Sequence, residues 1–181
     1  MRRFLLLLLL ISLGCQSAEP REKKVTVNPD ATPHPSDSNV PQTPVQPQVA
    51  DQTIRLNAQE AKFVELVNAY RIKVGCPALI LDPTLEKLAR NHSRDMATRD
   101  FFSHTNPDGQ SPFDRMRAAG IRYSHAAENI AHGQRTAQEV LQSWLNSAGH
   151  KKNIENCKLR YHGIGFYDVT NHWTHVFATF R

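Results

Sequence analysis

Residues 163–180 read GIGFYDVTNHWTHVFATF, and this stretch decides the fold. Two runs rich in aromatic and β-branched residues, 163–169 and 172–180, lie on either side of Thr170-Asn171, a pair typical of a turn between strands. Alternate residues of a strand point to opposite faces of a sheet, and both faces of the second run are largely apolar. The sequence therefore predicts a hairpin in a sheet that is covered on both sides.

Four helices are expected upstream of this hairpin. Each has a capping residue or a first-turn proline, followed by apolar residues at helical spacing. The first is expected to end at Gly75 and the third at Gly120. Helices followed by a buried sheet predict an α+β fold, a three-layer α-β-α sandwich with a mainly antiparallel sheet. The predicted starts are Asn57 with Glu60, Asp82-Pro83, Ser111-Pro112 and Thr136 with Glu139.

The distribution of charge argues against nucleic-acid binding. The chain has a formal net charge of +5, and residues 56–181 contain sixteen basic and twelve acidic side chains. Nucleic-acid binders usually cluster Lys and Arg on one element, whereas within residues 56–181 only Lys151 and Lys152 are adjacent. No nucleic-acid partner is expected.

The N-terminus has the pattern of an export signal. Arg2-Arg3 precede the apolar run 4–13, which is shorter than the roughly 20 residues that span a bilayer. The run ends at Gly14-Cys15, and a small residue before a cysteine resembles a bacterial lipobox, in which the cysteine is acylated. An ordinary cleaved signal is the alternative, because Ser12 stands where lipoboxes usually hold leucine.

The lipobox interpretation sets the expected domain boundaries and location. Residues 1–14 become a signal peptide and Cys15 the lipid anchor, so the protein is exported and membrane-anchored. Gln16 after the cysteine favours the outer membrane, with the domain periplasmic or surface-exposed. Residues 15–55 are a disordered tether, because residues 16–55 hold seven of the eleven prolines and no aromatic residue. One domain is expected over residues 56–181.

The cysteines are consistent with an exported protein. If Cys15 is acylated, Cys76 and Cys157 remain, and an exported compartment permits a disulfide between them. Two unrelated buried thiols are the alternative.

Several stretches in order resemble the CAP family of cysteine-rich secretory proteins, antigen 5 and pathogenesis-related 1 proteins, in its short bacterial form. The resemblance covers about residues 57–181, and its sequence motifs together are specific. They are Asn68-Ala69-Tyr70-Arg71, Phe101-Phe102-Ser103-His104 with Pro107-Asp108-Gly109, Glu128-Asn129-Ile130-Ala131, Trp144-Leu145-Asn146-Ser147 with Gly149-His150, and Gly163-Ile164-Gly165 with His172-Trp173-Thr174.

The resemblance implies a sandwich with a concave groove that larger members line with two histidines and two glutamates. Carried over by motif, these positions fall on His104, Glu128 and His150, while the second glutamate falls at or near Ser147. A serine is no carboxylate, so a triad is expected here. His125 and His132 flank Glu128 and are possible further members of the groove.

Two neutral imidazoles and a carboxylate are suitable ligands for a divalent cation, zinc above all. An open coordination position would acidify a bound water, as in a hydrolase. His104, Glu128 and His150 lie on separate segments, however, without the tight spacing of a helical zinc motif.

Three functions remain open from the sequence. The domain is a binding module for a lipid, cell-wall or protein ligand, a divalent-metal-dependent hydrolase on envelope or peptide substrates, or a structural or adhesive envelope protein. The missing fourth carboxylate favours binding over hydrolysis, and whether the protein is an enzyme stays open.

Overall fold

The computed structural model describes residues 54–181. The predicted signal peptide, Cys15 and nearly all of the predicted tether lie outside the described residues. No helix within the described range is long and apolar enough to cross a membrane. The elements in chain order are α1 (Ala58–Lys73), β1 (Ile80–Leu81), α2 (Pro83–Thr98), α3 (Pro112–Ala118), β2 (Tyr123–His132), α4 (Ala137–Leu145), α5 (Ala148–Ile154), β3 (Tyr161–Tyr167) and β4 (His172–Phe180).

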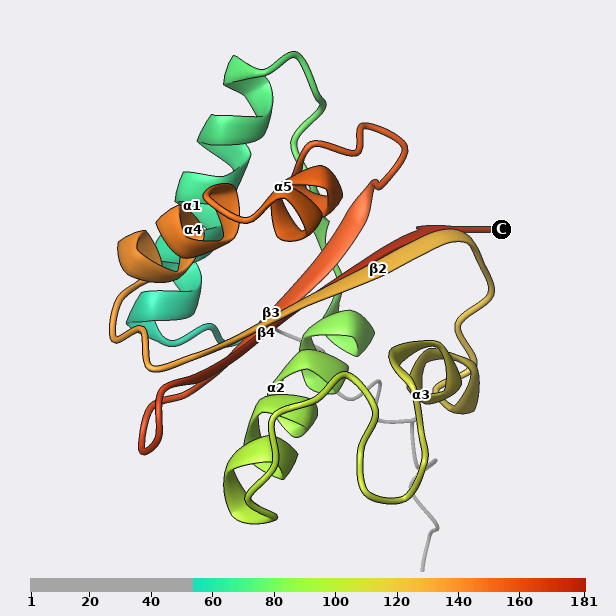
Figure 1. Ribbon diagram of the computed structural model, residues 1–181. Coiled ribbons are helices and arrows are strands. Elements are labelled where there is room, and N and C mark those ends of the chain that lie inside the picture. The colour runs from blue at the N-terminus through green and yellow to red at the C-terminus, as the bar shows by residue number, and fades with distance from the viewer. Residues whose placement is uncertain (1–53) are drawn as a thin grey trace, which may run out of the picture. The chain divides into compact units, whose positions relative to one another are not determined.

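The elements form the predicted three layers. The strands make one sheet in the order β1-β3-β4-β2. Helices α1, α4 and α5 lie on one side of it, and α2 and α3 lie on the other (Figure 1). The prediction of a mainly antiparallel sheet needs correction, because the sheet is mixed: β1 pairs with β3 in parallel, while β3 and β2 both pair with β4 antiparallel. A strand as short as β1 has no alternating pattern from which the sequence could predict it.

Local capping explains why the four expected helices form where they do. The Asn57 side chain accepts the backbone N–H of Glu60 at 2.9 Å, and the Glu60 carboxylate accepts the N–H of Asn57 at 2.9 Å. Asp82 caps α2 ahead of a first-turn proline, and Ser111 caps α3 in the same way. The predicted starts are confirmed because each depends on residues within one helical turn.

The β3–β4 hairpin supplies both faces of the core, as its alternation predicted. Trp173 and Phe177 on β4 pack towards α1 and α4, in one cluster with Phe63 and Trp144. Val176, on the other face, packs with Leu85 and Ala89 of α2. None of these side chains is more than marginally exposed.

Two glycines on β3 let α2 lie directly against the sheet. A Cβ atom at Gly163 would be 2.1 Å from the backbone of Leu85 and Glu86, and one at Gly165 would be 2.3 Å from the backbone of Arg90. Real Cβ atoms do not approach backbone so closely, so any side chain at either position would push the helix away from the sheet.

The disulfide between Cys76 and Cys157 is confirmed, with Cα atoms 4.9 Å apart. It joins the loop after α1 to the loop after α5. Arg71 is fully buried and donates to the carbonyl oxygens of four residues in these two loops or at the end of α5: Pro77, Ile154, Asn156 and Leu159. Burial lowers the pKa of the Arg71 guanidinium, and the nearby charge of Arg160 lowers it further.

Candidate functional site

Glu128 lies in the middle of β2, a strand that the sequence did not predict. β2 is at the edge of the sheet, and Glu128 stands opposite Val176 of β4. Because side chains alternate along a strand, Glu128 faces α2 and α3 while Asn129 faces α5. The hydrogen-bond partners of the two residues follow this division.

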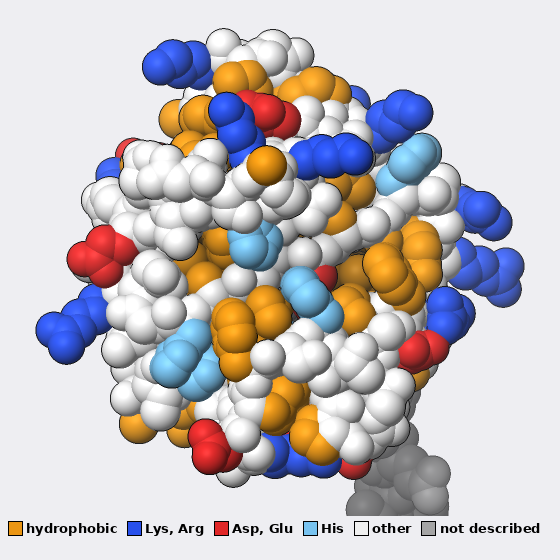
Figure 2. Space-filling view, in the orientation of Figure 1, with side chains coloured by type: hydrophobic (Ala, Val, Ile, Leu, Met, Phe, Trp, Pro, Cys, Tyr) orange, Lys and Arg blue, Asp and Glu red, His pale blue; other side chains and the backbone are white. Residues whose placement is uncertain are grey.

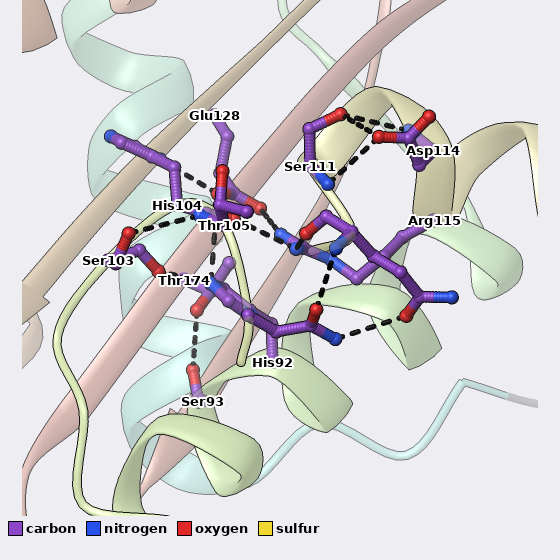
Figure 3. Close-up of polar contacts among 12 residues, drawn as sticks. His92, Ser93, Ser103, His104, Thr105, Ser111, Asp114, Arg115, Glu128 and Thr174 are labelled. Carbon is purple, nitrogen blue, oxygen red and sulfur yellow. Dashed lines mark hydrogen bonds and ion pairs between the residues drawn. The ribbon is translucent and has the colours of Figure 1, made fainter. Parts of the chain in front are cut away.

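Both oxygens of the Glu128 carboxylate are engaged. Oε1 lies 2.8 Å from Nδ1 of His104, and Oε2 accepts a hydrogen bond from Nη2 of Arg115 at 2.7 Å (Figure 3). The Glu128 side chain is only 2% exposed, whereas that of His104 is 48% exposed. A buried carboxylate needs such partners.

Arg115 of α3 is a member of the site that the sequence did not reveal. Besides Glu128, its guanidinium donates to the carbonyl oxygens of His104 at 2.9 Å and Gln110 at 3.0 Å. One side chain therefore fixes both the carboxylate and the loop that carries His104. No periodicity or motif marks an arginine that folds back from a helix in this way.

His92 lies under the same carboxylate. Its Nε2 is 3.0 Å from the carbonyl oxygen of Ser103 and 3.9 Å from Oε1 of Glu128. Burial lowers the pKa of His92, and the charge of Glu128 opposes that effect only in part. A neutral His92 that donates from Nε2 to Ser103 therefore supports the loop before His104.

The contact with Glu128 determines the tautomer of His104. A carboxylate that is paired with a guanidinium offers only acceptors, so Nδ1 of His104 carries the proton and donates it. When the ring is neutral, its lone pair is then on Nε2, at the opposite edge of a half-exposed ring. Figure 3 shows His104 reaching Glu128 from the loop between α2 and α3.

His150 belongs to α5, on the other side of β2. Its backbone carbonyl accepts a hydrogen bond from Asn129 at 3.1 Å, and Asn153 donates to Asn129 at 2.8 Å. Burial lowers the pKa of His150, and the nearby His104 lowers it further. Both effects favour the neutral form of the His150 imidazole.

The resemblance implies a metal site formed by His104, Glu128 and His150, and the structure shows where these side chains lie. Among residues 54–181, no group of three or more His, Cys, Asp or Glu side chains is placed to hold a metal ion. Glu128 orients the His104 imidazole through its contact with Nδ1. Metal-binding histidines commonly donate their second ring nitrogen to a carboxylate in this way.

Neither Ser147 nor His125 is among the hydrogen-bond or ion-pair partners of Glu128. Ser147 is the N-cap residue of α5, and its side chain makes no capping hydrogen bond. His125, near the start of β2, is exposed and lies 3.2 Å from the hydroxyl of Ser124. It lines a recess together with Lys151 and Lys152 instead of contacting Glu128.

His132, at the end of β2, forms a second group of rings. It stacks on His172 with ring centroids 4.1 Å apart, and the ring of Phe102 lies 6.1 Å from His132 and 6.4 Å from His172. Burial lowers the pKa of His172, and the neighbouring His132 lowers it further. Phe102 is 54% exposed, although it is a large apolar side chain.

Phe102 is two residues from His104, so the two groups adjoin. We call the surface formed by Phe102, His104, His132, His150 and His172, with Glu128 beneath it, the histidine face. Histidine and apolar side chains lie next to each other across the middle of the face shown in Figure 2. The sequence did not single out His172 or Phe102 as members of a site.

Comparison with known proteins identifies the family. The model of the cysteine-rich secretory protein family matches residues 64–180. The chain is 46% identical over 122 residues to the uncharacterized protein YkwD of Bacillus subtilis, covering 67% of this chain and 48% of that protein. It is 32% identical over 106 residues to the uncharacterized membrane protein YlbC of the same organism, covering 59% and 31%. The chain thus spans about half or less of these relatives.

Solved structures agree on the fold. An extracellular protein of Bacillus anthracis that contains an SCP domain matches with a TM-score of 0.63 and 32% identity, over 66% of this chain and 40% of that one. An outer surface protein of Borrelia burgdorferi matches with a TM-score of 0.65 and 22% identity, over 71% and 97%.

Proposed function

Because the chain belongs to the cysteine-rich secretory protein family, we propose that its folded part is an exported binding module whose ligand docks on the histidine face. The Cys76–Cys157 disulfide supports export, since such bonds persist in oxidising compartments. The extracellular relative from Bacillus anthracis supports it as well.

The observation that carries the proposal is the engagement of Glu128. His104 and Arg115 already occupy both of its oxygens, and the side chain is 2% exposed. A general base must reach the proton that it removes. A carboxylate held in this way acts instead as an anchor, which fixes the loop of His104 on β2. Ser147 lies at or near the position where larger family members carry a second glutamate, and the absence of a carboxylate there agrees with this role.

The side chains of the histidine face favour a cell-wall fragment over a lipid or a protein. Phe102 offers an exposed ring, and His104 offers a half-exposed ring nitrogen beside it. An apolar ring next to fixed polar groups suits a ligand that has both flat apolar faces and hydroxyl or amide groups, such as a sugar carrying a short peptide.

Binding of solubilised peptidoglycan fragments to the full chain tests the proposal. Isothermal titration should show saturable binding that His104→Ala and Phe102→Ala weaken at least tenfold. The matched controls are His125→Ala and Phe113→Ala, which remove an exposed ring of the same type elsewhere. They should bind as the wild type does.

Two outcomes would contradict this ligand. Equal loss in the controls would show that the effect is not local to the histidine face. Native mass spectra that retain a co-purified lipid, which Phe102→Ala releases, would identify a lipid as the ligand instead.

A metal-dependent hydrolase is the second candidate, and the contact of Glu128 with Nδ1 of His104 favours it, because Nε2 of this half-exposed ring then carries the lone pair. His104 and His150 would hold the ion, and a bound zinc would supply an acidified water. Zinc binding measured by titration should then weaken in acid, at a pH below the ordinary imidazole value of about 6.5, because burial lowers the pKa of His150. Loss of zinc binding in His150→Ala but not in His125→Ala would support the site, and equal uptake by both variants would exclude it.

We also propose that Cys15 carries the lipid that anchors the protein to the membrane. The support is the sequence alone: the Arg2-Arg3 leader, its short apolar run and the Gly14-Cys15 junction. The test is the labelling experiment described in the Discussion.

A further inference from the structure

One end of the domain gathers basic side chains that are scattered in the sequence. The loops after α1 and α5 meet here at the Cys76–Cys157 disulfide. We call this end the basic tip, and Figure 2 shows blue and orange side chains intermingled there, at the upper end of the molecule. Its basic members are Lys73, Lys151, Lys152, Lys158 and Arg160.

Contacts between the segments show that these residues share one end. The backbone N–H of Ile80 donates to the carbonyl oxygen of Arg160 at 2.8 Å, which brings β1 beside the loop after α5. Lys151, Lys152 and Lys158 line one recess of about 630 Å³. Lys73 is three residues from Cys76, whose disulfide partner adjoins Lys158.

The basic tip accounts for the net charge of the domain. Residues 56–181 carry sixteen basic and twelve acidic side chains, and the tip has five of the basic ones. Its one acidic residue, Glu155, accepts a hydrogen bond from the hydroxyl of Tyr70 and lies 3.7 Å from Lys151. The rest of the domain has eleven of each sign, so the positive charge is concentrated at one end.

Exposed aliphatic side chains lie among these charges. Ile72 is 65% exposed, Val74 is 41% exposed and Ile80 is 52% exposed. They come from the end of α1 and from β1, the segments on either side of Cys76. Half of the six large apolar side chains that are exposed in residues 54–181 are therefore at this end.

The tip is held rigidly. Besides the disulfide, the buried guanidinium of Arg71 donates to carbonyl oxygens on both of its loops. A buried arginine between two loops fixes their relative position, so the lysines and aliphatic residues are presented together in the free protein. Little ordering is then needed when a partner docks.

From this combination we propose that the basic tip docks on the surface of a membrane that contains anionic phospholipids. Each lysine near such a surface strengthens binding about fivefold, because the surface potential is negative. Aliphatic residues among the lysines then enter the boundary between headgroups and acyl chains. A soluble polyanion would use the charges but gain nothing from Ile72 and Val74, and this is why we favour a membrane. The proposal is independent of the histidine face.

Vesicle co-sedimentation tests it. The full chain, carrying Cys15→Ser so that no acyl group contributes, is mixed with vesicles of phosphatidylcholine alone or with an equal part of phosphatidylglycerol. Binding that the leader causes by itself is measured with the uncharged vesicles. We expect stronger binding to the anionic vesicles, and we expect salt to abolish the difference. The triple variant Lys73→Gln, Lys152→Gln, Lys158→Gln should lose at least about tenfold of the anionic preference.

The matched control removes the same amount of charge from exposed basic residues elsewhere, with Lys87→Gln, Arg94→Gln and Arg135→Gln. It should keep the anionic preference. Thermal melts should be alike for the two triple variants, since none of the six side chains is buried. An equal loss in both would overturn the proposal, because it would show that total charge, and not the tip, determines binding.

A second pair of variants separates a membrane from a soluble polyanion. Ile72→Ser with Val74→Ser should weaken vesicle binding severalfold and leave binding to inorganic polyphosphate unchanged. Val169→Ser, at a side chain that is 76% exposed in the β3–β4 turn, is the control and should change neither. If Ile72→Ser with Val74→Ser leaves vesicle binding intact, the aliphatic residues do not enter a bilayer and the membrane proposal fails.

Discussion

Mild acid should destabilise the domain through two buried histidines. Nδ1 of His162 on β3 lies 2.9 Å from Nε2 of His175 on β4, and both rings are fully buried. Burial lowers the pKa of His162 to about 3, and the charge of Arg71 adds to the effect. The pKa of His175 is also well below its usual value, because the ring is buried and His162 is next to it.

The direction follows from proton linkage. An unfolded histidine has a pKa near 6.5. Below about pH 6.5, His162 therefore binds a proton in the unfolded chain but stays unprotonated in the folded one. Acid therefore favours unfolding, and the stability is lost progressively between about pH 6.5 and the folded pKa of about 3. For His162 alone, the free energy of unfolding should fall by about 2 kcal/mol from pH 7.5 to pH 5. His175 acts in the same direction.

Urea unfolding followed by tryptophan fluorescence measures this loss, because Trp144 and Trp173 are both in the core. The range above about pH 5 largely avoids the carboxylates, whose usual pKa values are near 4. Exposed His125→Ala should keep the same pH dependence. His162→Asn with His175→Gln, if it folds, should have a shallower one. A loss below about 1 kcal/mol in the wild type at pH 5 would refute the reasoning.

Three further predictions concern separate parts of the chain. Arg115→Ala should lower the free energy of unfolding by about 3 kcal/mol, because it leaves the buried Glu128 carboxylate without its cation; a thermal melt within one degree or so of the wild type would contradict this. Labelling cells with a fatty-acid analogue should tag the wild type but not Cys15→Ala, and equal labelling would exclude the lipid anchor. Replacing Cys76 and Cys157 together by serine should cost about 2–5 kcal/mol in denaturant unfolding, and an unchanged midpoint would show that the disulfide contributes nothing to stability.

The sequence predicted those elements whose signals are local. Helix starts at Asn57 and Asp82 depend on a side chain bonding to backbone within one turn, and the structure confirms them. Strand β2 was not predicted, because Ala, Glu and Asn have low strand propensity and its conformation depends on pairing with β4. Helix α5 was missed as well, since Gly149 and the lysines that follow give no apolar repeat.

The sequence likewise predicted some residues of the candidate site and missed others. The motif positions led to His104 and Glu128, which the structure brings into contact. Arg115 and His172 were missed because their roles arise from contacts across 13 residues and across 40 residues of chain, and no local pattern encodes these. The need of Glu128 for polar partners was foreseeable from burial, but the identity of its cation was not.

Adjacent residues of β2 hold opposite flanks of the histidine face. Glu128 holds the loop of His104, and Asn129 holds α5 at His150. The separation of the two flanks is therefore set by a single peptide unit in a paired strand, which has almost no freedom to adjust. If the histidine face binds a ligand as proposed, we expect the width of that ligand to be limited, because neighbouring residues of one strand fix both flanks.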